Sequence, residues 1–352
     1  MATRRGFLAG LAALTLPKPG WADVGSPAYL AAGRMGDGFT LHGLTATGDS
    51  LFRIPLPARG HAAAAHPTLP HAVAFARRPG SFAIVIDCTT GGVLHRLSPP
   101  DGQQFNGHGC YSADGAMLMT SEVVGSTSEG RIGLWDAVGY QRIGDVPSGG
   151  IGPHDLKRMD DGRVVVANGG ICTDPIDRTK LNLDTMRPNL TLLSQEGAIL
   201  DQAELPPDMA QNSIRHLALT GTGVAFALQW EGDPDDPVPL LGLWTPGTAP
   251  RLCDAAPEDA FAMVGYAGSI AAIPGHIAIT SPKGGVVMIF DAAGQPLATH
   301  RRMDICGVAP WVDRFVATDG QGAVWACTAT GLTPLQRHAT AWDNHLVPVT
   351  HI

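Results

Sequence analysis

The stretch GIGPHDLKRMDDGRVVVANGGIC, residues 150–172, combines a His-Asp pair, an apolar run, a tight turn and a polar end within one short segment. Weaker copies recur as GHGCYSADGAMLMTSE (107–122) and IRHLALTGTGVAFALQ (214–229), and an earlier relative begins at GHAAAAHP (60–67). Each of the first three holds a histidine, an apolar run, a glycine-containing turn and a second apolar run. Such repetition is typical of propellers and solenoids, in which every repeat is one supersecondary unit.

The composition fits a compact protein made of short strands and tight turns. The chain has 352 residues, of which 44 are Gly and 28 are Pro, with 44% hydrophobic and 16% charged residues. A net charge of −8 at pH 7 argues against nucleic acid or an anionic membrane surface as a partner. No apolar run is long enough to cross a bilayer, so we expect no membrane insertion.

The first 22 residues, MATRRGFLAGLAALTLPKPGWA, have the pattern of an export signal. Arg4 and Arg5 precede a short apolar core, which is followed by a Pro/Gly break and a small residue at Ala22. The paired arginines resemble a twin-arginine signal, whereas an ordinary secretory signal is the alternative. We therefore predict a signal peptide over 1–22, a single mature domain over 23–352, and a periplasmic location.

Six cysteines would then meet an oxidising compartment: Cys88, Cys110, Cys172, Cys253, Cys306 and Cys327. None forms a CxxC or CxxCH motif, which disfavours zinc ribbons and covalent haem attachment. One or two disulfides and free buried thiols both remain open, because spacing does not choose among the connectivities.

Aligning the repeats on the residue expected to open each innermost strand gives seven such residues, which we call anchors. Their average period is roughly 47 residues, which suits propeller blades of four strands each. The sequence therefore predicts an all-β, seven-bladed β-propeller. The anchors are His61, His108, His154, His216, Gly268, Gly307 and His345, the two glycines being approximate.

The two ends of the chain predict how the ring closes. Only HLVPVTHI (345–352) remains after the last anchor, which is enough for one strand. The mature N-terminus supplies three strands without an innermost one, AYLAAGRM (28–35), FTLHGLTA (39–46) and SLFRIPL (50–56). Pairing the last strand with the first three completes a seventh blade and removes exposed sheet edges.

Blade geometry predicts which residues share the opening of the central channel. The anchor histidines are expected to line it, and the second strands and the loops 169–189 and 231–237 to end at the same face. Histidine is the commonest ligand for transition metals, and coordination needs three or four ligands. WD-type propellers carry a structural histidine at a similar Gly-His step, so a purely structural role stays open. The predicted metal ligands are His61, His108, His154, His216 and His345.

Eight further residues are expected around the same opening: Arg59, Arg78, Glu122, Asp155, Asn168, Arg187, Arg215 and Gln229. Asp155 could orient an imidazole or cap a local turn. The arginines could hold a carboxylate or phosphate through forked hydrogen bonds. The expected ligand is therefore a metal ion or a small anionic chelate.

The motifs RxH, GHG, GIGPHD, NGG, NLDTMRP and SIRHL resemble the DUF1513 family of exported bacterial proteins over nearly the whole mature chain. The resemblance implies periplasmic iron handling, because family genes commonly lie beside imelysin-type iron-uptake lipoproteins. It supplies no reaction. This chain departs from the pattern at Gly149 and Gly150, where the family leads us to expect a further histidine.

These observations favour a non-enzymatic periplasmic protein that binds a transition metal, iron first, or a metal chelate during metal acquisition, with a periplasmic iron-uptake protein as a candidate partner. No GxSxG, HExxH, P-loop or GxGxxG motif appears in a suitable context. A metal-dependent, lactonase-like hydrolase using Glu122 and Asn168 is the first alternative. A protein-interaction scaffold is the second.

Overall fold

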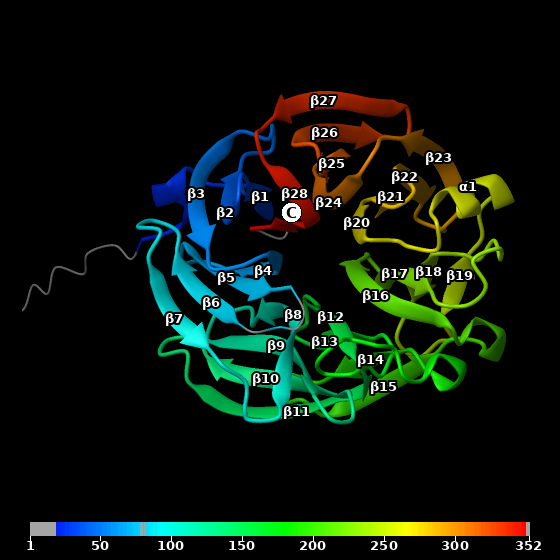
Figure 1. Cartoon of the computed structure of the whole chain (residues 1–352), viewed down its shortest axis with the longest axis horizontal. Coiled ribbons are helices and arrows are strands. Elements are labelled where there is room, and N and C mark those ends of the chain that lie inside the picture. Colours follow the sequence, from blue (N-terminus) through cyan, green and yellow to red (C-terminus); the bar gives the residue numbers. More distant parts are fainter. Residues whose placement is uncertain (1–18, 78–79, 81, 350–352) are drawn as a thin grey trace, which may run out of the picture.

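Seven four-stranded antiparallel sheets surround a central axis in the computed structural model, which describes residues 19–77, 80 and 82–349 (Figure 1). The predicted seven-bladed β-propeller is confirmed. Most of the predicted export signal, together with Arg78 and His351, lies outside the described residues.

The blades follow one another along the chain, each beginning with its innermost strand. Blades one to three comprise β4 (Gly60–Ala65), β5 (His71–Ala76), β6 (Ala83–Asp87), β7 (Val93–Leu97); β8 (Gln103–Tyr111), β9 (Met117–Val124), β10 (Glu129–Asp136), β11 (Arg142–Ile151); and β12 (Pro153–Arg158), β13 (Val164–Asn168), β14 (Asn189–Leu193), β15 (Ile199–Glu204). Blades four to six comprise β16 (Asn212–Leu219), β17 (Val224–Trp230), β18 (Leu241–Trp244), β19 (Arg251–Cys253); β20 (Ser269–Ile273), β21 (His276–Ser281), β22 (Val286–Asp291), β23 (Pro296–Arg301); and β24 (Ile305–Trp311), β25 (Arg314–Asp319), β26 (Ala323–Thr328), β27 (Gly331–Arg337).

The seventh blade joins the two ends of the described chain. The C-terminal strand β28 (Ala341–Pro348) pairs with β1 (Tyr29–Met35), which is followed by β2 (Gly38–Leu44) and β3 (Ser50–Leu56). Leu30 lies opposite Val347 in this pairing. The predicted closure is confirmed, and in Figure 1 the red β28 lies beside the blue β1.

Continuous apolar runs form the inner strands because the blades pack against one another on both faces. All five residues of β13 are buried, as are five of the six residues of β5. The outermost strands are largely exposed, as the pattern of β15 shows. A strand buried on both faces reads as an unbroken apolar run, which is the signal that the repeats carry.

In the described part of the chain, helical structure is confined to short connections: η1 (Trp21–Val24), η2 (Leu183–Thr185), η3 (Pro207–Met209) and α1 (Pro257–Ala262). Within the described ranges, none of these is long and apolar enough to span a membrane.

Strand pairing is irregular at each histidine on the inner strands. The register shifts lie between Gly60 and Ala63, Phe105 and Gly109, Pro153 and Asp155, and Ile214 and His216, and in β28 between Trp342 and Leu346. Of the two inner strands without a histidine, β20 pairs with β21 without a shift, whereas β24 has a shift between Ile305 and Val308. Because a bulge re-aims a side chain out of the normal alternation, these irregularities direct the five imidazoles toward the axis.

The inner strands begin earlier than the sequence indicated. His61 and His154 are the second residues of β4 and β12, but His108 is the sixth residue of β8. His216 and His345 are each the fifth residue of their strands. The expectation that every histidine opens its strand is therefore wrong, because the apolar pattern does not reveal residues paired ahead of a bulge.

Candidate metal centre

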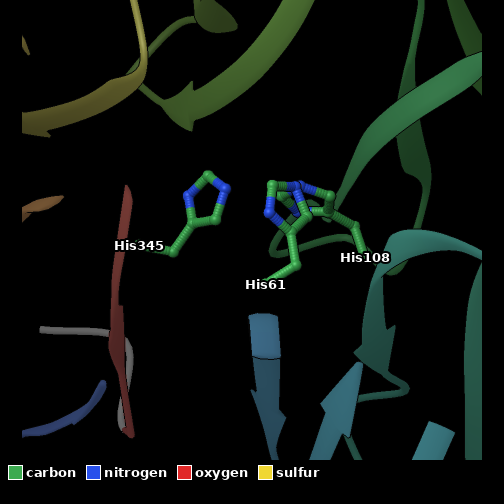
Figure 2. Close-up of side chains that lie close together, drawn as sticks. All are labelled: His61, His108 and His345. Carbon is green, nitrogen blue, oxygen red and sulfur yellow. The ribbon is translucent and has the colours of Figure 1, made fainter. Parts of the chain in front are cut away.

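Five imidazoles from five blades meet at the centre of the ring. The centroids of neighbouring rings are 4.5 Å apart for His61 and His345, and 4.7 Å apart for His154 and His216. His108 lies 4.8–5.6 Å from His345 and His216 by the same measure. Figure 2 shows His61, His108 and His345 pointing toward one another. We call these five residues the histidine cluster.

The histidine cluster is buried. Four of its members have between 4% and 8% of their surface exposed, and His61 alone is intermediate. Neighbouring rings lie close to one another along the central channel, which the sequence predicts them to line. An ion bound here would be held away from bulk water.

Two groups of three histidines have nitrogen atoms close enough to share an ion. His61, His108 and His345 form one group, and His108, His154 and His216 form the other, with the ligand atoms of each group within 4.8 Å of one another. The Nε2 atoms of His61 and His108 are 3.2 Å apart. Two nitrogens bound to one tetrahedral ion lie about 3.3 Å apart, so this pair already has the required separation.

Burial keeps part of the cluster unprotonated. It lowers the pKa of His216 and of His345 well below the usual value, and the His108 imidazole lowers both further. Neutral imidazoles present lone pairs, which is the form that metals bind. Among the described residues, Nδ1 of His216 and Nε2 of His345 have no hydrogen-bond partner. Buried nitrogens of this kind are uncommon, and coordination would satisfy them.

Asp155 is the carboxylate that contacts the cluster. Its Oδ1 lies 3.3 Å from Nδ1 of His108, and its Oδ2 accepts a hydrogen bond from the Leu217 amide at 3.0 Å. Burial opposes ionisation, but Lys157 and His108 outweigh it, so the pKa of Asp155 lies below its usual range. Such a carboxylate fixes the ring and leaves the other nitrogen facing a metal. Its partner is His108 of the neighbouring blade, not the adjacent His154.

Gly107 allows the close approach of two rings in the cluster. Its φ of 99° lies in a region that favours glycine, and a Cβ there would come within 2.5 Å of the His61 ring. The GHG motif is thus explained by backbone conformation and by contact with the preceding blade.

Two of the predicted polar ligands lie within blades and not in the cluster. Glu122 is fully buried and accepts hydrogen bonds from Arg142 at 2.9 and 3.0 Å. Burial raises its pKa despite this pairing. Asn168 bonds Ser148 and Asn189. These hydrogen bonds hold the side chains of Glu122 and Asn168 within their own blades.

The arginines differ in their partners. Arg59 forms a bidentate pair with Asp343, with N–O distances of 2.7 and 3.1 Å. Arg187 is largely exposed and pairs with Glu204 on the outer strand β15, away from the inner strands. Arg215 is buried and bonds Gln229, its neighbour on β17.

Three residues near the cluster were missed by the sequence reasoning. Asp343 binds Arg59 across 284 positions of the chain, and Asn344 donates a hydrogen bond to the Tyr266 hydroxyl at 3.0 Å. The polar pair Asp343-Asn344 directly before His345 was the available signal, since it interrupts an apolar strand.

All six cysteines are free thiols. Burial raises the pKa of Cys306 and of Cys327 to about 12, which keeps both thiols protonated. The sequence left disulfides and free thiols as alternatives, and the structure has free thiols.

The comparisons with known proteins identify a family and a fold. The family model described as "Protein of unknown function (DUF1513)" matches residues 54–349. No curated protein matches the chain. Similar solved structures include hydrazine synthase of Kuenenia stuttgartiensis, at 13% identity over 86% of this chain and 90% of that chain, with a TM-score of 0.59. "Structure of U3-55K" is 15% identical over 76% and 78% of the two chains, with a TM-score of 0.55. The computationally designed Ika8 protein is 15% identical over 92% and 87%, also at 0.55. At these identities the similarity shows the propeller fold alone.

Proposed function

The chain belongs to the DUF1513 family, and we propose that its histidine cluster binds a transition-metal ion in a non-enzymatic role in metal acquisition. The observation that carries this proposal is the convergence of five imidazoles, four of them buried, of which two have an unpartnered nitrogen among the described residues. A structural histidine of a propeller is held by its own hydrogen bonds, whereas unsatisfied buried nitrogens cost stability unless a ligand meets them.

The chemistry of the imidazole ligands limits which metal ions suit the site. Imidazole suits Zn, Cu, Fe and Ni, while hard ions prefer carboxylate and water oxygen. His216 and His345 supply neutral nitrogens, and Asp155 contacts Nδ1 of His108. We propose a divalent first-row ion, and iron would be bound as Fe(II). A periplasmic iron-uptake protein is the partner that this role implies.

A hydrolytic role has less support from the geometry. A hydrolytic metal needs an open position for water and a nearby general base. Here four of the five histidines are buried. Glu122, the candidate general base, forms an ion pair with Arg142. Binding without turnover is therefore the function that the site favours.

Metal analysis tests the proposal. Protein purified without a histidine tag is expected to contain about one equivalent of a first-row metal by elemental analysis. After its removal, Fe(II), Cu(II) or Zn(II) should bind more tightly than micromolar in isothermal titration, with Fe(III) as the hard-ion comparison. The metal proposal fails if none of these ions, alone or chelated, binds better than micromolar.

We propose a periplasmic location because of the leader, whose paired arginines lie at Arg4 and Arg5. The twin-arginine route reads the guanidinium pair, so replacing both by lysine is expected to leave the precursor in the cytoplasm. Fractionation and immunoblotting measure this, with export of the parent as the control. Unchanged periplasmic accumulation would return the leader to an ordinary secretory signal.

A further inference from the structure

Arg215 carries a buried positive charge directly beside a cluster histidine. Only 8% of its surface is exposed, and it precedes His216 on β16. Its Nε and Nη2 donate to the Gln229 amide oxygen at 3.2 and 3.0 Å. In the part of the chain that the structure describes, no carboxylate lies within ion-pair distance of it. A buried guanidinium that bonds only a neutral oxygen is costly, because charges leave water at the expense of several kcal/mol.

Glu231, an acidic side chain on the loop that follows β17, already has a partner. Glu231 pairs with Lys180 and accepts a hydrogen bond from Gln229 at 2.8 Å. It therefore neutralises the lysine and acts on Arg215 only at longer range.

Further polar groups lie next to Gln229, the hydrogen-bond partner of Arg215. Tyr266 forms a β-bridge with Gln229, and its hydroxyl accepts a hydrogen bond from Asn344, the neighbour of His345. The ammonium of Lys283 lies 5.1 Å from the centre of the Tyr266 ring. A second cation, Lys283, therefore lies near Tyr266, the residue that bridges to Gln229.

A bound metal would increase this surplus of positive charge. A divalent ion on neutral imidazoles adds two charges close to Arg215. Asp155 compensates little, because it is also 3.4 Å from the ammonium of Lys157. The loaded centre therefore calls for an additional anion.

We propose that Arg215 binds a small planar oxyanion, a carboxylate or carbonate, that enters the centre together with the metal ion. The forked donors of arginine match two oxygens of such an anion. Among the described candidate arginines, Arg59 and Arg187 already have carboxylate partners and Arg215 does not. This inference rests on the proposed metal function and specifies the chemical form of the ligand.

Titration of metal with and without added anion tests the inference. Zn(II) or Fe(II) nitrate is titrated into the metal-free protein in an anion-poor buffer, then with bicarbonate, with acetate, and as the preformed citrate complex. Coupling between two ligands is typically 5–150-fold, so at least one anion is expected to raise metal affinity roughly tenfold or more. A gain from bicarbonate or acetate indicates a free co-ligand, and a gain from citrate alone indicates a chelate.

Variants separate the anion site from the metal site. Arg215→Gln should retain metal binding and lose the gain from the anion, while Arg215→Lys should lose most of it because the fork is absent. Arg187→Gln is the matched control and should behave like the parent. Metal binding that no anion changes, or a gain that survives Arg215→Gln, overturns the anion inference and leaves the metal proposal standing. Absence of binding in every arm overturns both.

Discussion

Replacing His108 by alanine is expected to weaken metal binding roughly 100-fold, more than any other single histidine change. His108 belongs to both three-histidine groups, and Asp155 fixes its ring. A structural zinc site binds with about 10–16 kcal/mol, so one ligand of four contributes about 3 kcal/mol. Isothermal titration of Fe(II) and Zn(II) into the parent and the variant measures the loss.

Two further variants make this result specific. His345→Ala removes a member of only one group, so the remaining imidazoles should limit the loss to about tenfold. His276→Ala changes a histidine on β21 outside the cluster and should leave binding unchanged. If instead the parent binds no metal and His108→Ala only lowers the melting temperature, the cluster is structural.

The blades were predictable because each is a local pattern. Four short apolar runs separated by turns recur at a nearly constant period, and closure followed from a missing innermost strand at one end. The convergence of the histidines also followed from the repeat, since equivalent positions in a ring face one axis. These features depend on spacing along the chain, which the sequence displays directly.

The contacts between blades were not predictable in the same way. Asp155 reaches His108 of the preceding blade, and Arg59 pairs with Asp343 near the opposite end of the chain. Such partners depend on how the sheets stack and where bulges shift the register. Glu122 illustrates the point, because Arg142 on an outer strand of the same blade draws it away from the axis.

The sequence also could not predict which arginine is buried and which already has a carboxylate partner. The sequence offered four of them as equivalent anion ligands. In the structure Arg187 is exposed and paired, whereas Arg215 is buried beside His216 without a carboxylate partner in the described chain. An arginine can bind an anion if no carboxylate already pairs with it. That pairing depends on which side chains the folded structure brings together.

Acidification should release the metal only below the ordinary pKa of histidine, about 6.5. Burial lowers the pKa of His216 and His345, so protons compete for their nitrogens only at lower pH. The Kd should therefore stay constant from about pH 8 through about pH 6.5 and rise only at lower pH, on the order of tenfold per pH unit for each imidazole that takes up a proton. Titration of Zn(II) at a series of pH values measures this.

The same lowered pKa values predict how the metal-free protein responds to acid. Between the folded pKa and about 6.5 the unfolded chain binds more protons than the native protein, so stability is complete above this range and declines as pH falls. His345→Gln replaces the ring with a group that does not titrate, and denaturant unfolding should show a shallower decline for it than for the parent. Comparing the two cancels the contributions of His42, His66 and His71, whose pKa values are also lowered. Equal declines, or a Kd that already rises as the pH falls through about 6.5, would mean that water reaches the imidazoles, and the buried centre would then be the wrong description.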